Sequence, residues 1–184
     1  MLATTSARLL TYLAMAAALA PSGGLAGEPE DELKAAVVLS FLRYGEWGQA
    51  LPPNAVLTVG VLGRPGFAEV LRHSLAGKSV NGHALQVIEW KNAGEPHACQ
   101  VVYFATDKSP EIKAALETPA LARALTFGET RGFLDWGGAI NLFVLHEHMT
   151  FEVSLEALER SGVSISSRLL RFGQIRNGRQ GQRR

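Results

Sequence analysis

Apolar residues recur at helical spacing in the first part of the chain. Between residues 31 and 47 they fall three or four positions apart, which predicts a helix with Asp31 capping its start. The Pro-Pro-Asn cluster at 52–54 ends this element, and the β-branched run at 56–62 predicts a buried strand. A Gly-Arg-Pro-Gly turn follows, and the pattern over 67–75 predicts a second helix.

The middle of the chain continues this alternation of strand and helix patterns. Residues 79–90 alternate apolar and polar around an Asn-Gly pair, which is typical of a hairpin or a short strand. The apolar run at 99–104 predicts a central strand, and Pro110 suits the first turn of a helix after it. The pattern at 121–127 fits either the end of a helix or a strand.

The last third predicts two strands and two helices. Residues 137–145 and 149–153 have the pattern of strands joined by the polar turn His-Glu-His at 146–148. Helices are expected over 155–161 and 166–175, with a glycine between them. Together the patterns predict an α/β fold: one compact domain with a mixed sheet, helices packed on it, and a C-terminal β-hairpin followed by two helices.

The N-terminus has the order of a secretory signal peptide. Arg8 is the only charged side chain before Glu28, and the apolar run at 9–19 is followed by a Pro-Ser-Gly-Gly break and a small-residue triplet at 24–26. A retained membrane anchor is the alternative, but spanning a bilayer takes roughly 20 apolar residues, and this run is shorter. We therefore predict a protein of the periplasm with a cleaved signal peptide at 1–26, an α/β domain at 27–175 and a disordered basic tail at 176–184.

The charge balance limits the class of partner. The chain has 18 basic and 17 acidic residues, and removal of 1–26 leaves 17 of each. A nucleic-acid-binding domain is normally basic, with clustered Lys and Arg, whereas the only basic cluster here is the tail. We expect no nucleic-acid partner. The tail itself fits either a solubilising end or a weak tether to anionic lipid or polymer.

Cys99 is the sole cysteine, so an intramolecular disulfide cannot form. It opens the apolar run of the predicted central strand, and free cysteines are usually buried in such places. A buried, inert thiol is therefore expected. Pairing between two chains and a catalytic or redox thiol are the alternatives.

The remaining chemical signals are weak. The glycine-rich turn at 60–66 is neither a dinucleotide fingerprint nor a P-loop, so a plain tight turn is favoured over a phosphate site. His146 and His148 would lie on one side of a strand, but no third metal ligand follows from the spacing. Sequence motifs of serine hydrolases, β-lactamases and zinc proteases are absent. We expect that the protein is not an enzyme and that it binds neither a cofactor nor a metal.

Five ordered pieces of sequence resemble one protein family. The final third contains Gly-Gly-Ala-Ile-Asn at 137–141, Phe-Glu-Val-Ser-Leu at 151–155 and Gly-Val-Ser-Ile-Ser-Ser-Arg-Leu-Leu at 162–170. Upstream lie Phe-Leu-Arg-Tyr-Gly-Glu-Trp at 41–47 and Val-Gly-Val-Leu-Gly at 59–63. In order and spacing these pieces resemble the YfiR family of periplasmic proteins, over essentially all of the chain after the signal peptide.

The resemblance implies a regulatory function. Members of the YfiR family are implied to restrain an inner-membrane diguanylate cyclase from the periplasm, which keeps cyclic di-GMP and biofilm formation low. Two features depart from the family pattern: Cys99 stands alone where better-known members have paired cysteines, and Gly48 replaces a usual proline. Redox control through disulfides is therefore not expected for this chain.

Strand alternation selects a candidate surface for the partner. Phe151 and Val153 point to one face of their strand and Glu152 to the other, so Glu152 is expected to face outward. Ile140 on the neighbouring strand and Leu158 on the next helix would flank it as apolar contacts, an arrangement that suits an interface. In the alternative interpretation Glu152 is merely solvated, and Ile140 and Leu158 belong to the core.

A second class of function competes with the regulatory one. The cleft of an α/β domain could bind an amino acid or a cell-wall fragment, which would make the protein a periplasmic receptor acting on a sensor kinase or another membrane partner. A hydrolytic enzyme is the least favoured interpretation. A homodimer is an alternative that the sequence leaves open.

Overall fold

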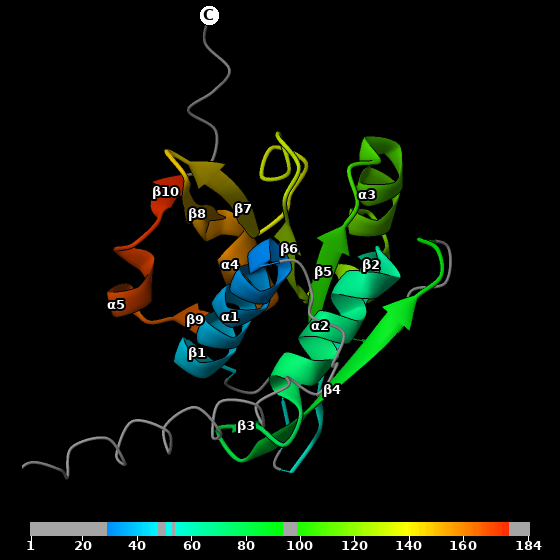
Figure 1. Cartoon of the computed structure of the whole chain (residues 1–184), viewed down its shortest axis with the longest axis vertical. Helices are drawn as coiled ribbons and strands as arrows, with labels where there is room; N and C mark the ends of the chain where they lie inside the picture. Colours follow the sequence, from blue (N-terminus) through cyan, green and yellow to red (C-terminus); the bar gives the residue numbers. More distant parts are fainter. Residues whose placement is uncertain (1–28, 48–50, 53, 94–98, 177–184) are drawn as a thin grey trace, which may run out of the picture.

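The computed structural model describes residues 29–47, 51–52, 54–93 and 99–176 (Figure 1). The expected signal peptide, Gly48 and the tail after Arg176 lie outside the described residues. The first half contains α1 (Pro29–Tyr44), β1 (Gly45–Glu46), β2 (Leu57–Gly63), α2 (Pro65–Leu75), β3 (Ser79–Val80), β4 (His83–Trp90) and β5 (Val101–Ala105). The second half contains α3 (Ser109–Leu116), the 3-10 turn η2 (Pro119–Leu121), β6 (Leu125–Gly128), β7 (Ile140–Leu145), β8 (His148–Ser154), α4 (Leu155–Ser161), β9 (Ser164–Ile165), α5 (Ser167–Leu170) and β10 (Gln174–Arg176).

An eight-stranded mixed sheet forms the centre of the molecule. Its strand order is β10-β8-β7-β6-β5-β2-β4-β3. The neighbouring strands β4, β2, β5, β6 and β7 are all parallel to one another. At the two ends of the sheet, β3 pairs antiparallel with β4, and β8 pairs antiparallel with β7. The last strand, β10, pairs parallel with β8. A second, two-stranded sheet joins β1 to β9. The expected α/β fold with a mixed sheet is confirmed.

The central strand β5 explains why two hydrophobic layers form. All five of its residues are buried. Val101 and Tyr103 pack in the cluster that contains the apolar residues of α1 and α2, whereas Val102 and Phe104 pack in the cluster that contains those of α3. Because successive side chains of a strand alternate between faces, a strand with helices on both sides must be apolar throughout.

Most elements follow the sequence pattern. The Asn-Gly pair turns a hairpin between β3 and β4, and residues 121–127 contain both of the alternatives left open, the end of a 3-10 turn and then β6. The expected cap at Asp31 is wrong, because α1 already begins at Pro29. In the part of the chain that the structure describes, no helix is long and apolar enough to cross a membrane.

The last predicted helix is much shorter than expected. The sequence pattern predicts a helix over 166–175, but α5 ends at Leu170 and the chain then enters β10. The side chain of Ser166 caps α5 by accepting a hydrogen bond from the Arg168 amide. Gly173 packs directly against the Phe151 ring, where a Cβ atom would come within 2.1 Å of the ring. This close approach places β10 beside β8, and strand pairing replaces the last helical turns.

Cys99 lies in a closed environment beside the central strand. It is 7% exposed, and the absence of a side chain at Gly60 makes room for both its sulfur and the Trp90 indole. Burial raises the pKa of the Cys99 thiol, and its contact with Trp90 opposes this only in part. The expectation that Cys99 is buried is confirmed.

We expect Cys99 to react slowly with a thiol reagent in the native protein and rapidly in denaturant, because both burial and the raised pKa suppress the reactive thiolate. A matched control is the double variant Cys99→Ala/Ala76→Cys, which moves the thiol to the exposed residue after α2 and should react rapidly without denaturant. Rapid labelling of native Cys99, or a disulfide-linked dimer on a non-reducing gel, would contradict the prediction.

Candidate functional site

The order of the strands creates a crevice at one edge of the sheet. From β2 the chain crosses through α2 to β4 on one side, whereas from β5 it continues through α3 to β6 on the other side. The connections therefore diverge at the carboxyl ends of β2 and β5, which is where doubly wound sheets bind their ligands. A crevice of about 880 Å³ lies at this point, lined by Gly63 at the end of β2, Ala105 at the end of β5 and charged residues around them.

A backbone contact fixes the shape of the crevice floor. The Arg64 amide donates a hydrogen bond to the Ala105 carbonyl at 3.1 Å, which ties the end of β2 to the end of β5. Gly63 has a φ of 119°, and a Cβ atom there would lie 2.3 Å from the Ala105 oxygen. Only glycine permits this approach of the two strand ends.

Arg64 and Lys34 join three carboxylates at the mouth of the crevice. The two terminal nitrogens of Arg64 each lie 3.0 Å from an oxygen of Asp31, and one of them lies 3.4 Å from Glu129. Lys34 lies 2.8 Å from Glu30 and also binds Glu129. We refer to Glu30, Asp31, Lys34, Arg64 and Glu129 as the ion-pair network. It connects α1 to the ends of β2 and β6.

Lys34 is the most enclosed cation of this network. Its side chain is 7% exposed, a burial that on its own would lower the pKa of the ammonium group. Hydrogen bonds to Glu129 and Glu30 outweigh that effect and raise the pKa above its usual value. Lys34 therefore stays charged, and its charge requires the surrounding carboxylates.

The hydroxyl group of Tyr103 lies beneath this network. Its ring packs 4.3 Å from that of Phe67 between centroids, and the residue is fully buried. The hydroxyl has no hydrogen-bond partner among the described residues. Burial, and then the negative charge of Glu129, raise the pKa of Tyr103 well above its usual range. Tyr103 is thus a neutral, buried polar group close to the ion-pair network.

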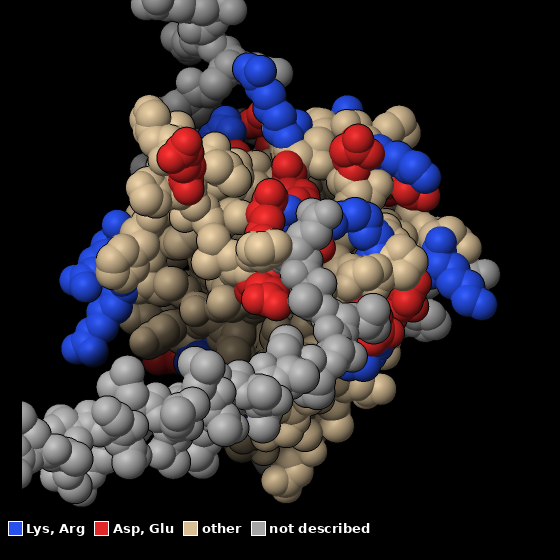
Figure 2. All heavy atoms as spheres, in the orientation of Figure 1, with Lys and Arg blue, Asp and Glu red and all other residues tan. Residues whose placement is uncertain are grey.

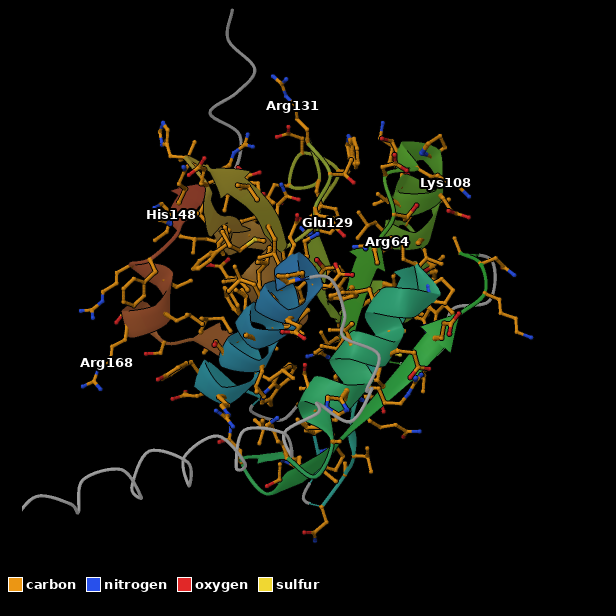
Figure 3. The ribbon with its side chains drawn as sticks, in the orientation of Figure 1. Arg64, Lys108, Glu129, Arg131, His148 and Arg168 are labelled. Atoms are coloured by element: carbon orange, nitrogen blue, oxygen red, sulfur yellow. The ribbon has the colours of Figure 1, made fainter. Side chains whose placement is uncertain are left out.

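Further cations surround the crevice. Figure 3 shows Arg64 and Glu129 between α1 and α2, with Lys108 at the start of α3 and Arg131 on the loop that follows β6. On the same side, acidic groups gather near the start of α1, with basic groups around them (Figure 2). Lys91 and Arg131 form no ion pair with another described residue. Alternating charges of this kind can hold a small polar molecule.

Among the described residues, no three His, Cys, Asp or Glu side chains are placed together to hold a metal ion. His148 is exposed at the start of β8, and His146 is exposed in the turn before it, with a φ of 48°. The glycine-rich turn ends in the contact between Arg64 and Ala105, and it carries no Lys-Ser or Lys-Thr pair at which a P-loop would hold phosphate.

The predicted partner residue Glu152 lies away from this crevice, on β8. Phe151 and Val153 are buried, and Glu152 points to the opposite face with its side chain 17% exposed. Glu152 accepts a hydrogen bond from the Asn141 amide at 3.2 Å and lies 3.6 Å from Arg176 on β10. The carboxylate is therefore held by neighbours and is only partly presented to a partner.

Ile140 and Leu158 do not flank Glu152 on the surface. Ile140 is fully buried opposite Val153, and Leu158 is 5% exposed on α4. Both pack in the cluster that includes α1, because the inward face of β7 and of α4 is the one that carries apolar residues. The expectation that they serve as exposed apolar contacts is corrected: both are core residues.

The ion-pair network was not predictable from local sequence patterns. Lys34 and Glu129 are 95 positions apart, and Arg64 lies 33 positions from Asp31. One signal was present: Lys34 stands among the apolar residues of the inner face of α1, where a charged residue needs partners. The identity of those partners depends on the topology of the sheet.

We expect Lys34→Met to lower the free energy of unfolding by about 2 kcal/mol, measured by urea denaturation. The cost stays below the roughly 3–5 kcal/mol of a fully buried broken pair, because Glu30 and Glu129 keep some contact with water. Adding Glu129→Gln to Lys34→Met should restore part of the stability, since it removes a carboxylate whose remaining ion pair, with Arg64, is the longer one at 3.4 Å.

The control is Arg72→Met, which breaks an exposed pair with Glu69 on α2 and should change the free energy of unfolding by less than about 0.5 kcal/mol. An effect of Lys34→Met no larger than that of Arg72→Met would mean that the network does not stabilise the fold.

Comparisons with known proteins identify the family. A conserved domain protein from Vibrio cholerae O1 biovar El Tor str. N16961 has a similar solved structure, with a TM-score of 0.53 and 14% sequence identity. The alignment covers 79% of this chain and 59% of that protein, and at this identity it shows the fold alone. The sequence matches no curated protein. The family model described as YfiR/HmsC-like matches residues 31–174, from the first turn of α1 to the start of β10, and the chain therefore belongs to the YfiR/HmsC-like family.

Proposed function

We propose that this protein is a periplasmic regulator that binds the periplasmic part of an inner-membrane diguanylate cyclase and restrains it. Cyclic di-GMP and biofilm formation then stay low. The observation that carries this proposal is the family match, which spans the whole sheet up to β10 and not only a local motif. The sequence of residues 1–26 supports export, since it has the charged, apolar and small-residue segments of a signal peptide in order.

The partner surface is proposed on the outward face of β7 and β8. Paired residues of adjacent strands lie on the same face of a sheet, and so do residues two positions apart along one strand. Glu152 pairs with Asn141, and Phe143 and Leu145 lie two and four positions beyond Asn141 on β7. The side chains of Glu152, Phe143 and Leu145 therefore point to the same, outward face. Leu145 is 43% exposed and Phe143 is half-buried. An exposed apolar side chain on the same face as the held carboxylate replaces Ile140 and Leu158 as the apolar part of the surface.

We expect Glu152→Gln and Leu145→Ser to raise cyclic di-GMP toward the level of a strain that lacks the gene, measured in cell extracts. Glutamine at position 152 still accepts the hydrogen bond from Asn141 but carries no charge. It is preferred to lysine, which would place a second cation beside Arg176. Glu156→Gln, on the exposed side of α4, is the matched control and should leave cyclic di-GMP unchanged.

Each variant must reach the periplasmic fraction in the same amount as the wild type for the comparison to count. If deletion of the gene leaves cyclic di-GMP and biofilm unchanged, the cyclase-inhibitor function is wrong. If deletion raises both but the two variants behave like wild type, the function stands and the proposed surface is wrong.

The crevice at the strand ends favours a second candidate function, a receptor for a small polar ligand. It lies at the position where the fold class binds ligands, and its lining contains both carboxylates and cations. An amino acid or a charged cell-wall fragment carries groups of both signs, which this lining would match. The receptor function is compatible with regulation of a membrane partner.

We expect titration with single amino acids and with muramyl dipeptide to give a saturable change in tryptophan fluorescence if the crevice is a receptor site. Lys108→Gln, at an exposed rim position, should weaken that binding, whereas Lys78→Gln, beyond the far end of α2, should not. The absence of a saturable change with every compound would remove the receptor function and leave the regulatory proposal untouched.

A further inference from the structure

The charges of this chain are strongly segregated along the sequence. The last 23 residues, 162–184, contain six arginines and no acidic residue. The remainder contains 12 basic and 17 acidic residues and is therefore acidic as a whole. A charge asymmetry of this kind indicates that one end of a protein contacts an anionic surface.

The described part of this basic segment forms an exposed edge of the fold. Arg168 belongs to α5 and Arg171 follows it, and neither forms an ion pair with another described residue. In Figure 3, Arg168 points away from the body of the protein. Arg176 differs from these two, because it is held by Asp135 and Glu152. Arg168 and Arg171 are thus exposed at this edge with no carboxylate partner among the described residues.

Large apolar side chains lie exposed in the same segment as these arginines. Phe172 is 66% exposed and Ile175 is 49% exposed, and the Arg171 guanidinium lies 4.9 Å from the centre of the Phe172 ring. We call Arg168, Arg171, Phe172 and Ile175 the C-terminal edge. Exposed aromatic and aliphatic residues between cations are typical of segments that lie in the interfacial layer of a bilayer.

We propose that the C-terminal edge docks the protein on an anionic phospholipid surface, with the arginines on the headgroups and Phe172 inserted between them. The edge favours lipid over an acidic protein, because the side chains of Arg168 and Arg171 are not fixed by any hydrogen bond to a described residue. A fluid layer of headgroups needs no fixed arrangement of cations, whereas an acidic protein groove does. The tail beyond Arg176 adds three more arginines to the same end of the chain.

This surface goes beyond the proposed regulatory function and uses none of its residues. It would hold the protein at the bilayer in which a membrane partner lies and so raise its local concentration there. The attraction should depend on anionic lipid and on ionic strength.

The test measures sedimentation of the protein, purified from the periplasmic fraction, with vesicles. Vesicles of phosphatidylcholine alone are compared with vesicles that also contain phosphatidylglycerol, at about 0.01 M and at about 1 M salt, where the Debye length falls from about 30 to 3 Å. We expect binding that requires phosphatidylglycerol and is lost at high salt. Arg168→Gln/Arg171→Gln should weaken it at least about tenfold, since one arginine near an anionic surface contributes about fivefold.

Two further variants separate the contribution of the edge from that of net charge. Arg72→Gln/Lys78→Gln removes the same charge elsewhere and should change binding by less than about twofold. Phe172→Ser should weaken binding with the charge unchanged, and its melting temperature shows that it folds.

Three results would overturn the proposal. The first is the absence of phosphatidylglycerol-dependent binding at low salt. The second is equal weakening by the two double variants, or loss of binding only on removal of residues 177–184. The third is a wild-type vesicle affinity in Arg168→Gln/Arg171→Gln together with lost control of cyclic di-GMP, which would assign the edge to a protein partner. None of these results bears on the variants at Glu152 and Leu145.

Discussion

Lys34 is a cation in the interior, and its need for anionic partners determines where α1 lies. The ammonium group is too enclosed to be stabilised by water, so carboxylates from α1 itself and from the end of β6 must surround it. Arg64, which follows β2, then offsets part of the negative charge through its two bonds to Asp31. The start of α1 is in this way attached to two different strand ends. The strand order creates the crevice, and apolar side chains cannot fill it because the carboxylates of Glu30 and Glu129 keep contact with water.

The same attachment influences the other end of α1. The helix leads directly into β1, which pairs with β9, and the Ser166 amide donates a hydrogen bond to the Tyr44 carbonyl. The start of the C-terminal segment is therefore fixed by the end of α1, whereas its last residues are fixed by pairing of β10 with β8. Between these two attachments Leu169 and Leu170 pack against the core, and Arg168, Arg171 and Phe172 are exposed.

The order of elements was predictable from the sequence because local patterns determine it. The β-branched run of β2 and the apolar run of β5 required burial on both faces, and the structure provides it. The length of α5 was not predictable, since the apolar residues of 166–175 also fit helical spacing. The decisive contact, between Gly173 and the Phe151 ring, joins residues that only the fold brings together. Asp31 was similarly misjudged as a cap, because its true partner, Arg64, lies on another element.

The residues around Glu152 show what the alternation of side chains along a strand can predict and what it cannot. Alternation correctly placed Phe151 and Val153 inside and Glu152 on the opposite face, because the register of β8 against β7 leaves only that choice. It could not show that Asn141 and Arg176 already bind Glu152, nor that the neighbours Ile140 and Leu158 face inward.

Glu152 consequently has a structural role as well as any role at an interface. By binding Arg176 it helps to hold β10 against β8. It also accepts a hydrogen bond from the side-chain amide of Asn141, which is buried. Loss of the Glu152 charge therefore first weakens the attachment of β10 to β8. Leu145 forms no contact of this kind with β10 among the contacts described. A change at Leu145 thus isolates the face of β7 and β8 as an interface. A change at Glu152 reports on that face and on the edge strand together.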